Sequence, residues 1–366
     1  MKVFSYIKNY LEFVVYYLLK IILGGNKKNE NTLLLINTGE IGDLVVSSIL
    51  LENPHAFDNF EKVKFLVKDQ YLKLFSNYKG RIEFIGYNYN NYKYSIIYKI
   101  KLLKNLRDEG FSKVINLTAA RGILNEELTH LCDGEVKIAL NSFWEYLGNS
   151  LGKYFDKKYD LIIGKEYKNE YDKHIELIKF LSKPNNIEIV FNNGFTFDEK
   201  IHKVEYELRT IVIAPFSSKR NRDWSCDNFR ILINELSKTY KIILLGSVEQ
   251  KNELFGLING NDNIEVLADC LKLNEIPFII KSARLFIGLD SGITHIALKM
   301  DVPIIAIIGG GEFGRFFPYK ESKKVKYLYN KLDCFFCHWK CLKSEMFCIT
   351  EIKPIDVLKL VPELIN

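Results

Sequence analysis

Short apolar runs alternate with longer amphipathic stretches over most of the chain. In the first half, buried strands are predicted near residues 33–36, 63–67, 82–85, 114–117 and 136–139, with helical patterns between them. A second series of strands is predicted near residues 210–215, 241–245, 285–287 and 304–308. Because such alternation is typical of parallel α/β sheets, the pattern predicts two Rossmann-like domains. We expect them over residues 30–200 and 208–350, joined by the weakly patterned, charged stretch 160–209.

The N-terminal region, residues 1–25, contains a strongly apolar predicted helix over residues 3–23. Lys8, Glu12 and Lys20 interrupt it, and its uncharged runs are far shorter than the ~20 residues that a membrane span needs. No small-residue cleavage site follows, which argues against a signal peptide. Two interpretations stay open: a helix lying in the membrane interface, favoured by its aromatic residues and basic flanks, or a helix packed on the first domain.

Composition narrows the class of protein. The 366 residues are 48% hydrophobic, which provides for a sizeable core and argues against disorder. The 51 basic and 45 acidic residues give a net charge of +6 that is too diffuse to favour nucleic acid. A mildly basic surface suits an anionic lipid or a phosphorylated substrate equally well. Seven cysteines in a chain of this length do not indicate secreted disulfides.

The stretch 284–315 contains a strand, a capped helix, a second strand and a glycine loop in that order. Asp290, Ser291 and Gly292 precede the predicted helix 293–298, and Gly309–Gly311 follows the second strand. A helix N-terminus at the carboxyl edge of a parallel sheet offers free N–H groups and partial positive charge, which suits a diphosphate. On these residues alone, ordinary helix capping and chain turning explain the pattern equally well.

Three further loops follow predicted strands. The loop Asn37–Asp43, with the sequence NTGEIGD, lies between the first strand and a helix expected to start at Leu44. A basic loop, Ser217–Trp224, follows the strand 210–215, and Gly246-Ser247 followed by Glu249 comes after the strand 241–245. Taken alone, Asp43 is explained as a helix cap, Glu249 as an acidic residue at a helix start and the basic loop as a solvated turn.

Together, the four blocks resemble glycosyltransferase family 9, the heptosyltransferase family, over roughly residues 32–362. The resemblance implies the GT-B architecture, in which two Rossmann-like domains face each other across a cleft and a C-terminal helix, here residues 353–366, returns to the first domain. The I-G-D motif implies that Asp43 is the catalytic base. The family usually has Lys-x-Trp in the basic loop, and Arg222 stands here in place of that lysine, which preserves the charge but not the geometry.

The same resemblance implies a set of donor-binding residues in the second domain. They are Lys219, Arg222, Glu249, Asp290, Ser291, Gly292, Thr294, His295, Gly310 and Gly311. A lone helical histidine is more often packed than ligand-binding, but the D-S-G-x-x-H motif favours a donor contact for His295. Arg121, which follows the fourth strand, is interpreted as a surface arginine rather than as a phosphate contact.

The activity that the resemblance implies is inverting transfer of a heptose or similar sugar from a nucleotide-sugar, with ADP-heptose favoured. The acceptor would be lipopolysaccharide core or another glycolipid or surface glycan, reached in the cytoplasm by peripheral contact with the inner face of the bacterial inner membrane. No Asp-x-Asp motif occurs in a suitable place, so we expect catalysis without a metal cofactor. Two alternatives are a protein-modifying heptosyltransferase and a catalytically silent nucleotide-sugar binding protein.

Four cysteines form a separate motif near the C-terminus. Cys334, Cys337, Cys341 and Cys348 have the spacing C-x2-C-x3-C-x6-C, which is compact enough for four thiolates to bind one structural Zn or Fe ion. The alternative is four reduced thiols beside a packed turn that contains Trp339. Since the motif directly precedes the terminal helix, we expect it to lie away from Asp43 and from the donor loop.

Overall fold

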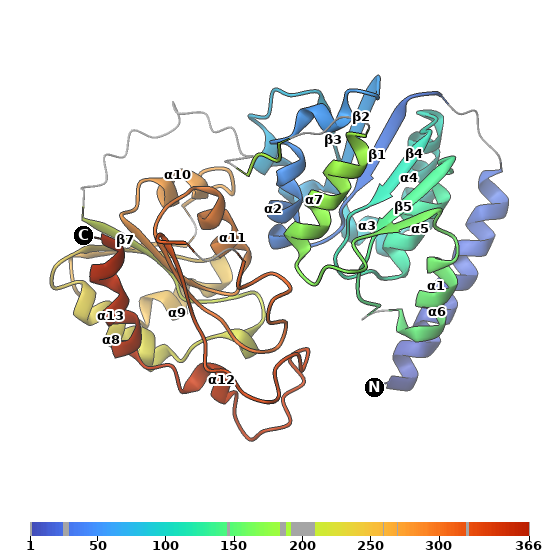
Figure 1. Ribbon diagram of the computed structural model, residues 1–366. Coiled ribbons are helices and arrows are strands. Elements are labelled where there is room, and N and C mark those ends of the chain that lie inside the picture. The colour runs from blue at the N-terminus through green and yellow to red at the C-terminus, as the bar shows by residue number, and fades with distance from the viewer. Residues whose placement is uncertain are drawn as a thin grey trace. The chain divides into compact units, whose positions relative to one another are not determined.

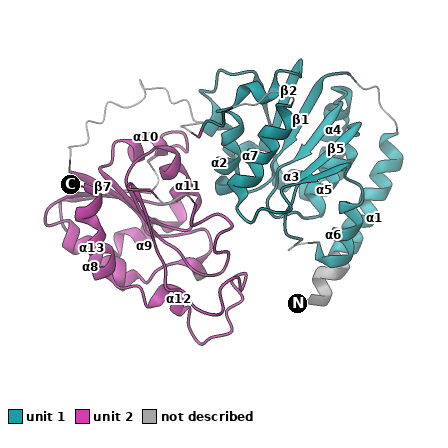
Figure 2. Ribbon diagram, in the orientation of Figure 1, with its two compact units in different colours: residues 1–190 teal, residues 191–366 magenta. Residues whose placement is uncertain are grey.

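The computed structural model describes residues 2–24, 29–144, 147–183, 188–191, 209–258, 260–268, 270–319 and 322–365. The chain divides into two compact units, Met1–Val190 and Phe191–Asn366, and each is described by itself (Figure 2). Both units contain a six-stranded parallel sheet with helices packed on its faces (Figure 1). This agrees with the α/β class and the two Rossmann-like sheets that the sequence predicts.

The sheet of the first unit has the strand order β3-β2-β1-β4-β5-β6. Its strands are β1 Thr32–Ile36, β2 Lys62–Lys68, β3 Ile82–Tyr87, β4 Lys113–Asn116, β5 Val136–Leu140 and β6 Leu161–Ile163. Its helices are α1 Lys2–Leu23, α2 Ile41–Ser47, α3 Tyr89–Tyr94, α4 Ile96–Asp108, α5 Ile123–Leu131, α6 Gly148–Asp156 and α7 Glu170–Leu181. The prediction missed β6 and assigned its residues to the connection, because a three-residue strand is too short to show a period.

The sheet of the second unit has the order β12-β11-β10-β7-β8-β9. Its strands are β7 Thr210–Ala214, β8 Lys241–Leu245, β9 Ile264–Leu267, β10 Leu285–Leu289, β11 Ile304–Ile307 and β12 Val325–Leu328. Its helices are α8 Cys226–Leu236, α9 Lys251–Phe255, α10 Ile276–Lys281, α11 Gly292–Lys299, α12 Phe347–Thr350 and α13 Pro354–Ile365. All residues of β7 and β10 are buried, as expected for central strands covered on both faces.

The strand orders place a topological switch point in each sheet. In the first unit, the chain builds outward from β1 toward β3 and then returns to β4 on the other side of β1. In the second unit, it builds outward from β7 toward β9 and returns to β10. Ligands of open α/β sheets bind at the carboxyl ends of the strands beside such a point. The loops that follow β1, β4, β7 and β10 are therefore the places to look for function.

Helix α1 packs on the first unit and also has an exposed apolar face. Tyr16 and Leu19 are buried in the core of the unit, where α1 contacts α4 and α5. The opposite face exposes large apolar side chains, namely Tyr10, Leu11, Val14, Leu18, Ile21 and Ile22. The helix therefore belongs to the fold, and its outward face still has the amphipathic character of an interfacial helix. Among the described helices, none combines the length and apolarity that crossing a bilayer requires.

The C-terminal helix packs within the second unit, whereas the resemblance implied that it packs on the first domain. The apolar face of α13, formed by Val357, Val361 and Ile365, lies in the hydrophobic core of the second unit. The helix packs against α8, β10 and β11. Arg284, which precedes β10, also binds the carbonyl oxygen of Ile365 through its guanidinium group. A short amphipathic helix packs where apolar surface is available, and the second unit supplies that surface.

Candidate functional site

The predicted base, Asp43, lies in the first turn of α2. That helix begins at Ile41, three residues before the predicted start, so Asp43 is its third residue rather than the residue before it. Asp43 Oδ2 accepts a hydrogen bond from the backbone N–H of Glu40 at 2.9 Å. A Cβ at Gly39 would overlap the Asp43 carboxylate, which explains the glycine at this position. The capping alternative is thus part of what Asp43 does, and its role as a base stays a prediction.

Glu40 fixes the loop that carries Asp43. Its carboxylate pairs with Lys68 Nζ at 2.6 Å and accepts a hydrogen bond from the hydroxyl of Tyr71. Burial alone would raise the pKa of Glu40, but the hydrogen bonds from Lys68 and Tyr71 outweigh it, so the pKa lies below its ordinary value. Lys68 Nζ also lies 4.9 Å from the centre of the Tyr89 ring. These contacts hold the start of α2 at the carboxyl edge of β1 and β2.

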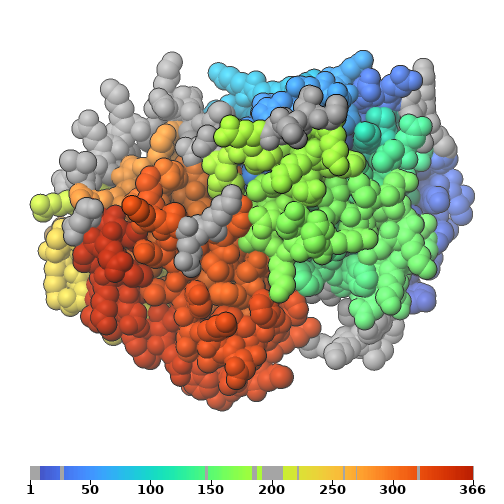
Figure 3. All heavy atoms as spheres, in the orientation of Figure 1, coloured from blue at the N-terminus to red at the C-terminus, as the bar shows by residue number. Residues whose placement is uncertain are grey.

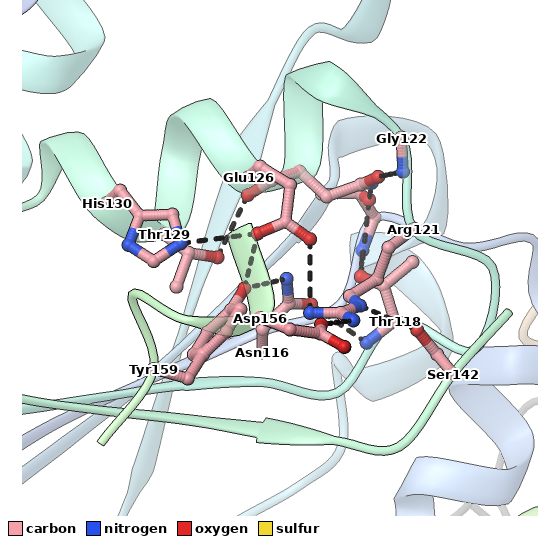
Figure 4. Close-up of polar contacts among 12 residues, drawn as sticks. Asn116, Thr118, Arg121, Gly122, Glu126, Thr129, His130, Ser142, Asp156 and Tyr159 are labelled. Atoms are coloured by element: carbon pink, nitrogen blue, oxygen red, sulfur yellow. Dashed lines mark hydrogen bonds and ion pairs between the residues drawn. The ribbon is translucent and has the colours of Figure 1, made fainter. Parts of the chain in front are cut away.

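Arg121 is buried, and the prediction of a surface arginine is wrong. Its side chain is 1% exposed and pairs with Glu126 at 3.2 Å and with Asp156 (Figure 4). Arg121 Nε donates to Ser142 Oγ at 2.7 Å, and the hydroxyl of Tyr159 donates to Glu126 Oε2 at 2.7 Å. The partners lie 5 to 38 residues along the chain from Arg121, in or after α5 and α6, so a local pattern did not reveal them.

The Arg121 network extends to the Asp43 loop. Asn116 donates to the hydroxyl of Tyr159 at 3.0 Å and accepts the N–H of Thr118 at 3.0 Å. The hydroxyls of Thr118 and Thr38 are 3.3 Å apart. Since Thr38 opens the loop after β1 and Thr118 follows β4, this buried polar chain joins the two sides of the switch point in the first sheet. We infer that it holds the Asp43 loop in place.

The basic loop after β7 gives its three cations different environments. Arg220 pairs with Asp223 at 3.1 Å and also with Glu253, so its charge is already balanced within the unit. Lys219 is exposed. Arg222 lies with its guanidinium carbon 4.9 Å from the centre of the Trp339 ring. Of the three, Arg222 has the environment that best suits a phosphate contact, because Arg220 is occupied and Lys219 is solvated.

The Asp290–Ser291–Gly292 stretch lies at the carboxyl end of β10, beside β7. Asp290 is buried, and burial raises the pKa of its carboxyl group while the charge of Arg222 opposes that rise. Ser291 is the residue before α11, yet its side chain makes no capping hydrogen bond. Gly292 is the first residue of the helix, and the Thr294 hydroxyl donates to the carbonyl of Leu289. Asp290 and Arg222 thus follow the neighbouring strands β10 and β7 at the switch point of the second sheet, close enough for the charge of Arg222 to act on the Asp290 carboxyl group.

His295 and Glu249 lie in different surroundings. The His295 ring is buried and stacks on Phe317 with ring centres 4.2 Å apart. Burial, helped by the charge of Lys299, lowers the pKa of His295 to about 3, so any donor contact would be made by a neutral imidazole. Glu249 is exposed in the short turn Val248–Gln250 after β8, where a hydrogen bond from Ser247 lowers its pKa.

The four cysteines and the glycine loop after β11 line the same small cavity. Cys334, Cys337, Cys341 and Cys348 line a cavity of about 10 Å³ together with Gly310, Gly311 and Trp339. Phe335 lies where a Cβ of Gly310 would be, and Trp339 lies where a Cβ of Gly311 would be. The expectation that the cysteines lie away from the donor loop is therefore wrong. These glycines allow the cysteine motif to pack on their backbone, and their predicted donor contact remains a prediction.

The cavity has about the room that one water molecule or ion needs. Burial raises the pKa of the Cys348 thiol, and the other three cysteines raise it further, while a backbone hydrogen bond with Gly310 lowers it. Within the described residues, no three His, Cys, Asp or Glu side chains are already placed around a common metal position. The four thiols therefore share a cavity without forming a finished metal site.

Comparisons with known proteins agree with this geometry. The model of glycosyltransferase family 9 (heptosyltransferase) matches residues 193–339. Lipopolysaccharide heptosyltransferase 1 of Campylobacter coli is 25% identical over 359 residues, which cover 90% of this chain and 98% of that relative.

Two solved structures share the fold. The ADP-heptose lipopolysaccharide heptosyltransferase II of E. coli superposes with a TM-score of 0.67 at 16% identity, over 91% of this chain and 98% of that one. The iron-containing dodecameric glycosyltransferase TibC of enterotoxigenic E. coli superposes with a TM-score of 0.56 at 13% identity, over 93% and 77%. With its two parallel sheets, the family match on the second unit and a relative aligned over nearly its full length, the chain is similar to glycosyltransferase family 9, the heptosyltransferase family, and these likenesses indicate a glycosyltransferase.

Proposed function

We propose that the protein transfers a heptose from ADP-heptose to a lipopolysaccharide-core acceptor, with inversion at the sugar carbon and without a catalytic metal. One observation carries the proposal most directly. The predicted base follows β1 at the switch point of the first sheet, while Arg222 and Asp290 follow β7 and β10 at the switch point of the second. Ligands of such sheets bind at these edges.

In this mechanism, Asp43 accepts the proton of the acceptor hydroxyl as that oxygen attacks the sugar carbon. The bond from that carbon to the diphosphate breaks on the opposite face, which inverts the configuration. Arg222 and the N–H groups at the start of α11 stabilise the negative charge that develops on the leaving diphosphate. Lys219, Glu249, Ser291 and His295 are proposed as further donor contacts.

The four cysteines are proposed to bind one structural Zn or Fe ion. Their shared, ion-sized cavity and their thiol chemistry support this, and thiolate sites of this composition suit both metals. The likeness to a glycosyltransferase described as iron-containing and dodecameric favours iron and keeps the protein-modifying alternative open. The ion would have a structural role, with no part in the transfer step.

The exposed face of α1 is proposed to contact the inner face of the bacterial inner membrane. An apolar stripe is formed by Leu11, Val14, Leu18 and Ile21. A basic residue, Lys20, lies near this stripe, close enough to Tyr17 for its charge to act on the tyrosine hydroxyl. Apolar burial supplies the affinity for an interface, and lysines add attraction to anionic lipid. Such contact would bring a soluble donor and a lipid-anchored acceptor to the same enzyme.

The test is a transfer assay with ADP-heptose, GDP-sugars and UDP-sugars against a heptose-free lipopolysaccharide core. We expect product only from ADP-heptose, with inverted anomeric configuration by NMR and unchanged rate in EDTA. A protein acceptor assayed in parallel decides between the two transferase functions. If no donor supports transfer but nucleotide-sugars still bind, the silent binding protein is the correct interpretation.

A further inference from the structure

The cysteine loop, defined here as residues 332–348, is bonded directly to the glycine loop after β11. The backbone N–H of Phe336 donates to Gly310 O at 2.8 Å, and that of His338 donates to Gly311 O at 2.9 Å. The Trp339 ring lies against the Gly311 backbone at a distance that excludes a side chain there. The C-terminal part of the second unit, in orange and red, forms much of its visible surface (Figure 3).

The backbone of the cysteine loop adopts an unusual conformation around Trp339. Phe336, His338 and Trp339 have φ angles of 69°, 51° and 59°, in the left-handed region that bulky residues avoid. Such conformations persist only where the surroundings determine them, and they cluster at functional sites. The hydrogen bonds to the glycine loop help to hold this conformation. The contact between His338 Nδ1 and Glu312 Oε1, at 2.8 Å, also helps to hold it.

Trp339 brings two unpartnered donors together. Its ring centre is 4.9 Å from the guanidinium carbon of Arg222. Within the described part of the chain, both Trp339 Nε1 and Arg222 Nε are buried and have no hydrogen-bond partner. Buried donors are rarely left without an acceptor, because the loss of hydration is then uncompensated. Two of them in stacked side chains indicate that an acceptor group is brought by a ligand.

We propose that Trp339 is a phosphate-binding residue: its indole stacks on Arg222 and, with Arg222 Nε, donates its N–H to the oxygens of the donor's diphosphate. The cysteine loop thereby completes the donor site. This inference rests on the proposed function of the second unit as the nucleotide-sugar site. It also accounts for Arg222 in place of the family's lysine, since a planar guanidinium stacks on an aromatic ring while presenting N–H donors at its edge.

The experiment is calorimetric titration of the full-length protein with ADP, GDP, UDP, inorganic diphosphate and adenosine. In Trp339→Phe the ring remains and the N–H is lost, so we expect roughly 3–10-fold weaker binding of the best nucleoside diphosphate, the value of one neutral hydrogen bond. Trp339→Ala and Arg222→Lys should each cost more than this, and their effects should not add in the double variant. Adenosine binding, which needs no phosphate contact, should not change.

A matched control is Trp224→Phe. The indole N–H of Trp224 already donates to the carbonyl of Ile352 at 2.8 Å, so its loss should lower the melting temperature and leave ADP affinity unchanged. If both Trp339 variants are folded and bind as the wild type does, the inference is overturned. If only Trp339→Ala binds weakly, the N–H contact is refuted. If wild type binds none of the phosphate ligands, the proposed function fails and the inference fails with it.

Discussion

Asp43 and Glu40 hold each other at the start of α2: the Asp43 carboxylate accepts the Glu40 N–H at 2.9 Å, and Glu40 in turn pairs with Lys68 at 2.6 Å. The proposed base is therefore oriented by the helix that it caps. The contact from the Glu40 N–H fixes the orientation of the Asp43 carboxylate. A capping role and a catalytic role are compatible here, and mutation can separate them.

The first prediction concerns Asp43→Asn. The amide oxygen of asparagine can still accept the Glu40 N–H, so the fold and the donor affinity should be nearly unchanged. Asparagine cannot take a proton, and turnover should fall by roughly 10²–10⁴, the usual contribution of a positioned base. Steady-state assays of transfer check this, with the exposed Asp108→Asn as the control. Turnover close to wild type would leave Asp43 with its capping role alone.

The second prediction compares Arg222→Ala, Ser291→Ala and Arg220→Ala. A charge-assisted phosphate contact contributes roughly 1.5–3 kcal/mol and a neutral one about 1 kcal/mol, so loss of Arg222 should weaken donor binding more than loss of Ser291. Arg220 is already paired with Asp223 and Glu253, so its removal should leave donor affinity unchanged. Calorimetry with ADP-heptose measures all three. If only Arg220→Ala weakened donor binding, the diphosphate contact would have to be assigned to Arg220 instead of Arg222.

These results show what the sequence was able to predict. The central strands of both sheets and the four loops at their carboxyl ends follow from local patterns, because period and turn residues are local properties, whereas the short strands β6, β9 and β12 were not predicted. The burial of Arg121 depends on Glu126 and Asp156, whose approach is set by helix packing. The position of the cysteine motif against Gly310 and Gly311 likewise depends on tertiary contacts, so its spacing alone suggested a separate site.

A third prediction separates the two faces of α1. Leu18 is exposed and Leu19 is completely buried, although they are neighbours. Leu18→Glu should release the protein from anionic liposomes and leave its melting temperature unchanged, because it removes only outward apolar surface. Leu19→Ala should keep liposome binding and lower the free energy of unfolding by about 2–5 kcal/mol, as for other buried leucines. Cosedimentation and thermal unfolding report the two properties. Equal liposome binding by wild type and Leu18→Glu would refute the membrane contact.

A fourth prediction concerns the stability of the protein in acid. The pKa of His295 is about 3 in the fold, whereas an exposed histidine titrates near 6.5. Between these values the unfolded chain binds a proton that the folded chain does not, so stability should fall as pH decreases from about 6.5 toward 3. His295→Gln should flatten this part of the pH dependence. Urea unfolding at several pH values tests it, with His55→Gln as the control. Parallel curves for wild type and His295→Gln would contradict the prediction.

The last prediction concerns the four cysteines. Because they lie beside the glycine loop, we expect their loss to affect ADP binding as well as stability, which a metal site far from the donor loop would not do. Protein purified without a histidine tag should contain about one Zn or Fe per chain, as a four-thiolate site requires. Cys337→Ser should lose that metal and lower the melting temperature. Because Cys337 lies two residues before Trp339, and the cavity shares a wall with Gly310 and Gly311, the same variant should also weaken ADP binding.

The exposed Cys226, in α8, provides a matched control, and Cys226→Ser should change none of the three properties. Elemental analysis, thermal unfolding and calorimetry measure them in turn. A metal-free wild type would remove the ion from the proposal. Metal loss in Cys337→Ser with wild-type ADP affinity would show that the ion stabilises the loop without setting the position of Trp339. The two outcomes distinguish a structural ion that also supports the donor site from one that only stabilises the second unit.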